Sequence, residues 1–147
     1  RHTLARTEGL FDIVFLDAFS TQRNSELWTV DFFRAIRGRM AADGVLVTYC
    51  AALPVRAGLC EAGFAVGETP PFGRARGGTI AALDAQHVTL PLPERERYLM
   101  QSTTRGIPYR DPDFTRTNRE ILRARQDEIC ADPRRGAGEG LPAEHDI

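Results

Sequence analysis

The stretch Phe11-Asp12-Ile13-Val14-Phe15-Leu16-Asp17 is an apolar run that ends in a carboxylate. Its β-branched and aromatic residues predict a strand of a parallel sheet that is buried on both faces. A second apolar run, Val45–Tyr49, follows after a helical stretch, and this alternation is typical of an α/β fold. Open α/β sheets bind their ligands beyond the carboxyl ends of the strands. We therefore expect the functional site around Asp17.

Length and composition predict one domain with one ordinary core, since the chain has 147 residues and 42% hydrophobic content. The formal net charge of −1 gives no bulk attraction to nucleic acid. Charge can still be segregated between faces, so RNA is not excluded. All 19 basic residues are Arg. That bias fits bidentate phosphate contacts, but the nucleotide composition of the genome explains it more simply.

The cysteines and histidines lie far apart, at Cys50, Cys60, Cys130, His2, His87 and His145. Neither a disulfide framework nor a metal site has such spacing, so we expect no metal. No apolar stretch approaches the length that spans a bilayer, so no membrane association is expected. Free thiols favour the reducing cytoplasm as the location.

The central part of the chain predicts alternating helices and strands. Apolar residues recur at helical spacing over 29–40, with Thr29 as the helix cap, and Asp43-Gly44 predicts a turn into the strand that starts at Val45. Pro54 fits the start of a second helix, which Gly63 closes. Strands over 64–67 and 79–83, joined by a basic loop, complete the sheet of a domain at 1–90.

Two further helices form a predicted appendage at 91–130. They cover 94–104 and 117–130, and the second opens with a capping box of Thr117 and Glu120. Beyond it, residues 131–147 have few apolar anchors, so we expect a disordered tail. The chain opens with Arg1 and reaches a core strand within about ten residues, which indicates that an upstream part is missing.

Three segments in order match the pattern of a known family: Phe11–Ser20 (FDIVFLDAFS), Asn24–Thr29 (NSELWT) and Gly44–Tyr49 (GVLVTY). The chain resembles the MnmC-type tRNA methyltransferase domain, and the resemblance extends to Leu83. The segment Ile107–Pro112 (IPYRDP) further resembles the tail of stand-alone members, which lack the fused oxidase domain.

The resemblance implies a class I, Rossmann-like methyltransferase fold, of which this chain carries the carboxyl-terminal half of the sheet and a helical appendage. It implies S-adenosylmethionine-dependent methylation of the exocyclic amine of 5-aminomethyl-(2-thio)uridine at the tRNA wobble position. The partners would be the tRNA anticodon loop and a separate oxidoreductase of the same modification pathway. The glycine-rich turn and ribose-binding acid of such enzymes find no match, so the cofactor-binding residues are expected upstream of Arg1.

The resemblance makes Asp17 the catalytic or substrate-orienting group, and the chemistry agrees. A protonated aminomethyl group has no lone pair to attack a methyl sulfonium. A carboxylate that accepts its N–H points the neutral amine in line, and can take its proton. The alternative interpretation is an Asp that caps a turn or pairs with an Arg.

Four further residues are candidates for substrate binding. Phe19 can stack on the target uracil while Ser20 hydrogen-bonds its edge, although aromatic residues beside a sheet are commonly packing groups, as expected of Trp28. Arg74 and Arg76 lie in a glycine-rich loop from which they can reach anticodon-loop phosphates. A solvated basic loop is the alternative for these arginines.

Three positions depart from the family pattern: Thr21 and Ser25 each stand where Pro is usual, and Ala75 stands where Lys is common. Together with the unmatched cofactor half, these departures support an alternative, an inert or degenerate α/β fragment that binds tRNA or protein. Another alternative keeps methyl transfer but changes the acceptor to a different amine, since a carboxylate does not by itself select tRNA.

Overall fold

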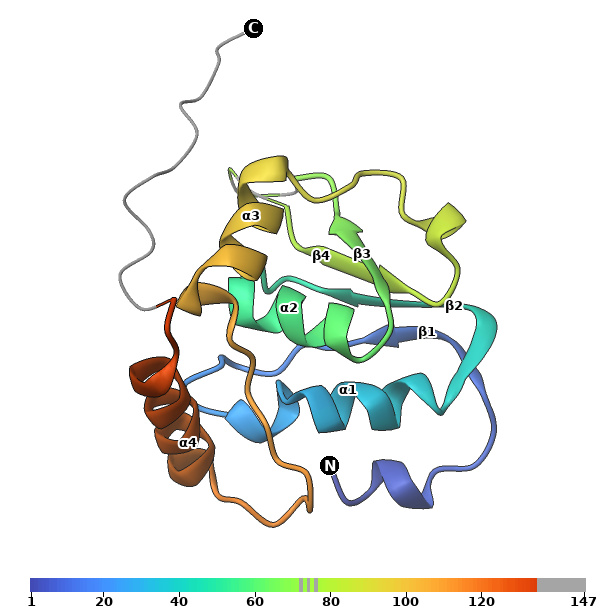
Figure 1. The fold of residues 1–147 in the computed structure, drawn as a ribbon. Helices are drawn as coiled ribbons and strands as arrows, with labels where there is room; N and C mark the ends of the chain where they lie inside the picture. Colours follow the sequence, from blue (N-terminus) through green and yellow to red (C-terminus); the bar gives the residue numbers. More distant parts are fainter. Residues whose placement is uncertain (72, 74, 76, 135–147) are drawn as a thin grey trace, which may run out of the picture.

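The computed structural model describes residues 1–71, 73, 75 and 77–134. Its centre is a four-stranded sheet in the order β1-β2-β4-β3, formed by β1 (Phe11–Phe15), β2 (Met40–Thr48), β3 (Ala65–Glu68) and β4 (Thr79–Ala82) (Figure 1). β1 and β2 are parallel, and β4 runs antiparallel to both of its neighbours. This architecture confirms the predicted Rossmann-like α/β class and the predicted order of strands and helices.

Helix α1 (Val30–Arg37) forms as its apolar spacing predicts. The Thr29 hydroxyl accepts a hydrogen bond from the Phe32 N–H at 3.1 Å and caps the first turn. Its apolar face, which includes Phe33 with no exposed surface, packs into the core. The helix ends three residues before the predicted boundary, because Met40 already belongs to β2.

The predicted turn at Asp43-Gly44 is wrong, since both residues lie inside β2. Met40 pairs with Phe11 and Val45 with Ile13, so the residues between them form an irregularity in the ladder. A Cβ atom at Gly44 would lie 2.9 Å from the Ala41 carbonyl oxygen. A glycine therefore permits close backbone approach within a strand here, and local sequence does not distinguish that role from a turn.

Helix α2 (Leu53–Glu61) begins with Pro54 in its first turn, and Gly63 follows it at φ +91°, as predicted. Its most unusual residue is Arg56, whose side chain is fully buried. Arg56 Nε donates to Thr79 Oγ1 at 3.0 Å, and Nη2 donates to the Gly78 carbonyl at 2.9 Å. Ion pairs to Glu68 and Glu96 compensate the buried charge. One guanidinium group thus joins α2 to β3, β4 and α3 (Glu94–Ser102).

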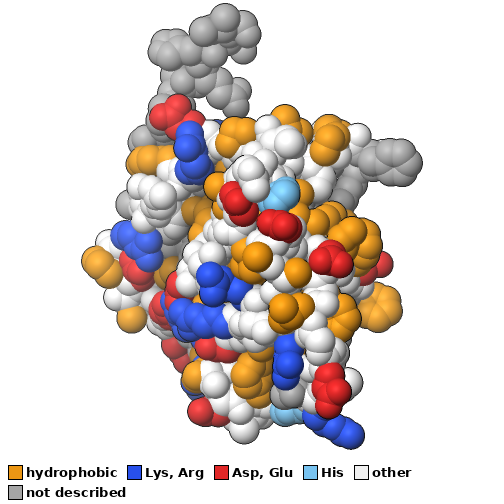
Figure 2. All heavy atoms as spheres, turned by 90° about the vertical axis from the view of Figure 1, so that its right-hand side faces the viewer, with side chains coloured by type: hydrophobic (Ala, Val, Ile, Leu, Met, Phe, Trp, Pro, Cys, Tyr) orange, Lys and Arg blue, Asp and Glu red, His pale blue; other side chains and the backbone are white. Residues whose placement is uncertain are grey.

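β1 is the edge strand of this sheet, and it is not buried on both faces as predicted. Ile13 is 54% exposed and Phe15 is 75% exposed. Strand β2 pairs with one edge of β1, and no other strand of the described chain pairs with β1. The run therefore contains more apolar side chains than the described residues bury. Figure 2 shows a face where hydrophobic side chains lie among acidic and basic ones.

The carboxyl-terminal appendage packs against α2 and the start of α1. After α3, the segment around Tyr109 pairs with Thr29, and the Val30 N–H donates to the Tyr109 carbonyl at 3.0 Å. Helix α4 (Asn118–Ala131) starts with the predicted capping box of Thr117 and Glu120. The predicted tail falls mainly on 135–147, outside the described residues, whereas Arg134 donates to the Gln101 carbonyl at 2.9 Å.

We expect the Arg56→Ala variant to lose about 3–5 kcal/mol of unfolding free energy, because it leaves the Glu96 carboxylate buried without its partner. Chemical denaturation measures the loss. Arg97→Ala, at an exposed position on α3, is the control and should unfold like the wild type. Combining Arg56→Met with Glu96→Gln should recover part of the loss. Equal stability of Arg56→Ala and wild type would contradict the role of the cluster.

Candidate functional site

Asp17 lies two residues beyond the last residue of β1, where the chain leaves the sheet. The Leu16 N–H still donates to the Val47 carbonyl at 2.9 Å, so pairing with β2 continues almost to Asp17. The Asp17 side chain is exposed. It lines a shallow pocket of about 320 Å³ together with Phe15, Thr48 and Tyr49. The structure therefore places Asp17 at the carboxyl ends of two parallel strands, where α/β sheets bind ligands.

Tyr49 is a site residue whose role the sequence did not reveal. Because Phe15 pairs with Val47, Tyr49 stands at the same level of the sheet as Asp17. Its hydroxyl lies within hydrogen-bonding reach of the Ala18 and Phe19 carbonyls, and a hydroxyl can donate to one of them at a time. Tyr49 thus holds the chain that follows Asp17. An aromatic hydroxyl at the end of the neighbouring strand was the available signal.

The loop after Asp17 presents Phe19 to solvent, with 83% of its surface exposed. The next residue, Ser20, closes a tight turn, since its carbonyl accepts the Asn24 N–H at 2.9 Å and its hydroxyl oxygen accepts the Arg23 N–H at 3.2 Å. The Ser20 hydroxyl keeps its own proton for donation to another group. Phe19 and Ser20 therefore lie beside Asp17 on the same loop.

Trp28 ends this loop and is fully buried in the hydrophobic core, as predicted. Its ring meets that of Tyr49 edge to face, with centroids 6.4 Å apart. Three buried polar atoms of the loop, Asn24 Oδ1, Glu26 Oε2 and Trp28 Nε1, have no hydrogen-bond partner in the described part of the chain. Unpaired buried polar atoms are uncommon, so their concentration on one loop distinguishes it from the rest of the structure.

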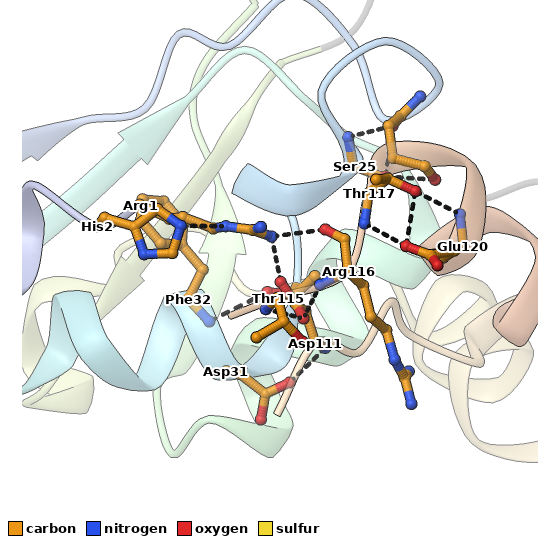
Figure 3. Close-up of polar contacts among 12 residues, drawn as sticks. Arg1, His2, Ser25, Asp31, Phe32, Asp111, Thr115, Arg116, Thr117 and Glu120 are labelled. Carbon is orange, nitrogen blue, oxygen red and sulfur yellow. Dashed lines mark hydrogen bonds and ion pairs between the residues drawn. The ribbon is translucent and has the colours of Figure 1, made fainter. Parts of the chain in front are cut away.

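The segment of the appendage between α3 and α4 contains a polar cluster centred on Asp111 (Figure 3). The Asp111 carboxylate is fully buried, pairs with Arg1, and accepts the N–H groups of Thr115 at 3.1 Å and Arg116 at 3.0 Å. Its own N–H donates to the Asp31 carboxylate at 2.7 Å. These bonds fix the segment between α3 and α4 against α1.

A second link joins the appendage to α2. Arg110 forms a two-point contact with Glu61, at 2.6 and 2.9 Å. The guanidinium group, by hydrogen-bonding the ionised form, lowers the pKa of the Glu61 carboxyl. Both side chains are partly exposed, so solvent screening limits the contribution of this pair to stability.

The remaining predicted site residues, Arg74 and Arg76, lie outside the described residues, so their approach to a substrate stays a prediction. Within the described part of the chain, no group of three His, Cys, Asp or Glu side chains is placed to hold a metal ion. The same residues contain no helix long and apolar enough to cross a membrane.

The amino-terminal part of the chain is similar to a known protein family. Residues 1–84 match the model of a family described as S-adenosyl-L-methionine-dependent methyltransferase. The chain belongs to this family. The match ends just beyond β4 and contains Asp17 and the loop that follows it. The family therefore includes the whole described sheet and the candidate site.

The chain is also similar to individual proteins. The chain is 34% identical to MnmC2 from Aquifex aeolicus, whose crystal structure superposes with a TM-score of 0.79 over 88% of this chain and 42% of that one. It is 44% identical over 48% of its length to the tRNA 5-methylaminomethyl-2-thiouridine biosynthesis bifunctional protein MnmC of Ralstonia nicotianae. An uncharacterized protein of Methanocaldococcus jannaschii is 32% identical over 86% of the chain. These matches confirm the predicted MnmC-type resemblance.

The chain spans less than half the length of these relatives: 42% of the Aquifex chain, 36% of the Methanocaldococcus protein and 11% of the Ralstonia protein. The strands that carry the candidate site are thus present, and the relatives contain much additional sequence.

We expect Phe19→Ala to change the unfolding free energy by no more than about 0.5 kcal/mol, because the ring is exposed. Trp28→Ala should cost about 3–5 kcal/mol, because it empties a core position. Denaturant unfolding followed by circular dichroism measures both. A large loss for Phe19→Ala would mean that this ring is a packing group and not a surface available to a substrate.

Proposed function

We propose that the full-length protein methylates the exocyclic amine of 5-aminomethyl-(2-thio)uridine at the tRNA wobble position, with S-adenosylmethionine as the methyl donor. The observation that carries the proposal is the exposed Asp17 carboxylate at the carboxyl ends of β1 and β2, within the part of the chain that matches the methyltransferase family. The names of the MnmC relatives, which are tRNA-modifying proteins, support tRNA as the substrate class.

The residues present fit the reacting end of the cofactor. When bound, S-adenosylmethionine supplies an electrophilic methyl group on a positive sulfonium. A carboxylate and the face of an aromatic ring suit such a cation, and Asp17 and Tyr49 line one pocket. For the nucleoside end, no ribose-binding acid is assigned among the described residues.

In the proposed mechanism the substrate amine reacts in its neutral form, and Asp17 accepts one of its N–H groups. The same hydrogen bond points the nitrogen lone pair away from the carboxylate and towards the methyl group. Asp17 would then receive the proton that the nitrogen loses as the carbon–nitrogen bond forms and the methyl–sulfur bond of the donor breaks. Positioning and proton acceptance each contribute up to a few powers of ten in rate.

Phe19 and Ser20 would hold the target base. The exposed Phe19 ring offers a stacking surface for an extruded uracil, and the Ser20 hydroxyl has a proton to donate to its edge. Arg74 and Arg76 would contact anticodon-loop phosphates. The association with a separate oxidoreductase and the cytoplasmic location remain predictions. Both are consistent with a tRNA substrate.

We expect Asp17→Asn to lower kcat for methylation of undermodified tRNA by at least about 100-fold, because the amide cannot take the amine proton. The fold should be unchanged, since the side chain is exposed. Asp12→Asn, an exposed carboxylate on the same strand, is the matched control. Near-normal turnover by Asp17→Asn would remove Asp17 from the chemistry.

We further expect the cofactor to bind mainly through residues that precede this chain in the full-length protein. The exposed Ile13 and Phe15 side chains of edge strand β1 support an additional strand there. Calorimetric titration of S-adenosylmethionine should give binding to a version extended upstream and little binding to residues 1–147 alone. Equal binding to both would mean that the described residues hold the whole cofactor site. Binding to neither would favour an inert or degenerate protein.

A further inference from the structure

The loop that carries Phe19 and Ser20 is held at its far end by one side chain of the appendage. Asn118 Oδ1 accepts the Ser25 N–H at 2.8 Å and also pairs with the Ser25 hydroxyl. Asn118 Nδ2 donates to the Gln22 carbonyl at 2.8 Å. A single amide thus joins two residues of the loop, and it comes from a residue more than ninety positions away in the sequence.

We infer that Asn118 is a positioning residue, through which the carboxyl-terminal appendage holds the substrate-binding loop between Asp17 and Trp28 in its working conformation. The inference rests on the proposed function for its effect on catalysis. It assigns to the appendage a role at the site, although the family match ends at residue 84, well before Asn118.

The Asn118 side chain is available for this role because another residue caps α4. Thr117 and Glu120 form the capping box, in which Glu120 accepts the Thr117 N–H at 2.7 Å. Asn118 is the first residue of the helix and points its amide towards the loop. Its two amide atoms match their partners, since the oxygen faces donors and the nitrogen faces a carbonyl.

Further contacts hold the helix that carries Asn118. The segment that leads into α4 is fixed by the buried Asp111, which pairs with Arg1 and accepts two backbone N–H groups (Figure 3). Farther along α4, Arg125 donates to the Ile107 carbonyl at 2.7 Å and lies over the Tyr109 ring at 5.0 Å. The Asn118 amide is therefore attached to a helix that is itself anchored to α1.

Ser25 contributes both its N–H and its hydroxyl to the contact with Asn118. A proline at this position, as in the family pattern, would have neither the N–H nor the hydroxyl that bond Asn118. Proline restricts the backbone covalently, whereas Ser25 obtains its restriction from hydrogen bonds to the appendage. At the other end of the loop, Tyr49 is bonded to the Ala18 and Phe19 carbonyls. Tyr49 and Asn118 together hold both ends.

Asn118→Ala in the full-length protein tests the inference. Hydrogen exchange measured by mass spectrometry should rise at least about tenfold in peptides covering 20–28, because the Ser25 N–H loses its acceptor. The kcat for tRNA methylation should fall about tenfold or more, and KM for tRNA should rise, because a misplaced loop misorients the substrate. The dissociation constant for S-adenosylmethionine should stay within about twofold.

Thr117→Ala is the matched control, since it weakens the cap of α4 but leaves the Asn118 amide in place. It should lower the unfolding temperature at least as much as Asn118→Ala, without the change in loop exchange or kcat. In a double-mutant cycle, Ser25→Ala should add little to Asn118→Ala if the two residues act through one contact. Asn118→Asp keeps the acceptor for Ser25 and should restore part of the activity.

The possible outcomes separate this inference from the proposed function. Faster loop exchange in Asn118→Ala, with no methyl transfer to tRNA by the wild type, would support the contact and overturn the proposed substrate. An active wild type whose Asn118→Ala variant shows unchanged loop exchange and unchanged kcat would overturn the positioning role. Parallel losses in Thr117→Ala and Asn118→Ala would also overturn it, because they would reduce Asn118 to a contribution to helix stability.

Discussion

The buried guanidinium group of Arg56 is the constraint on which the arrangement of the sheet depends. It lies on α2, yet it bonds Thr79 and Gly78 at the start of β4 and the carboxylates of Glu68 and Glu96. A charge buried to this extent is tolerated only when its donors are satisfied. Any shift of β4, β3 or α3 relative to α2 would break one of these bonds. The cluster therefore fixes α2 and α3 against β3 and β4. Thr79 extends it to the chain that follows β2, because its hydroxyl donates to the Cys50 carbonyl at 2.7 Å.

The site is built at the opposite edge from β3, where β1 and β2 run parallel. Parallel pairing puts both carboxyl ends at one side of the sheet, so Asp17 and Tyr49 meet without any contribution from the loop itself. The loop is then restrained by Tyr49 and by Asn118 of the appendage. Rigid elements thus supply the carboxylate, and hydrogen bonds position the residues expected to touch the base.

Local signals in the sequence were sufficient for much of the fold. Thr29, Pro54 and the Thr117–Glu120 capping box marked helix starts correctly, because each acts within one turn of its own helix. The predicted start of β2 was wrong, because Gly44 permits a close approach to the Phe11 backbone that no local pattern encodes. The Arg56 cluster and the Asn118 contact were missed for the same reason. Their partners lie tens of residues away and carry no periodic pattern.

The exposure of β1 connects the fold to the chemistry. An apolar edge strand with Ile13 and Phe15 exposed offers unpaired backbone and hydrophobic surface, which soluble proteins normally cover. The Asp17 carboxylate leaves the sheet from this same strand. A further parallel strand paired with β1 would bring its own carboxyl end next to Asp17. The same additional strand would then cover the hydrophobic edge and complete a cofactor site beside the carboxylate. Without that strand, an isolated chain could keep its own core and still lack activity.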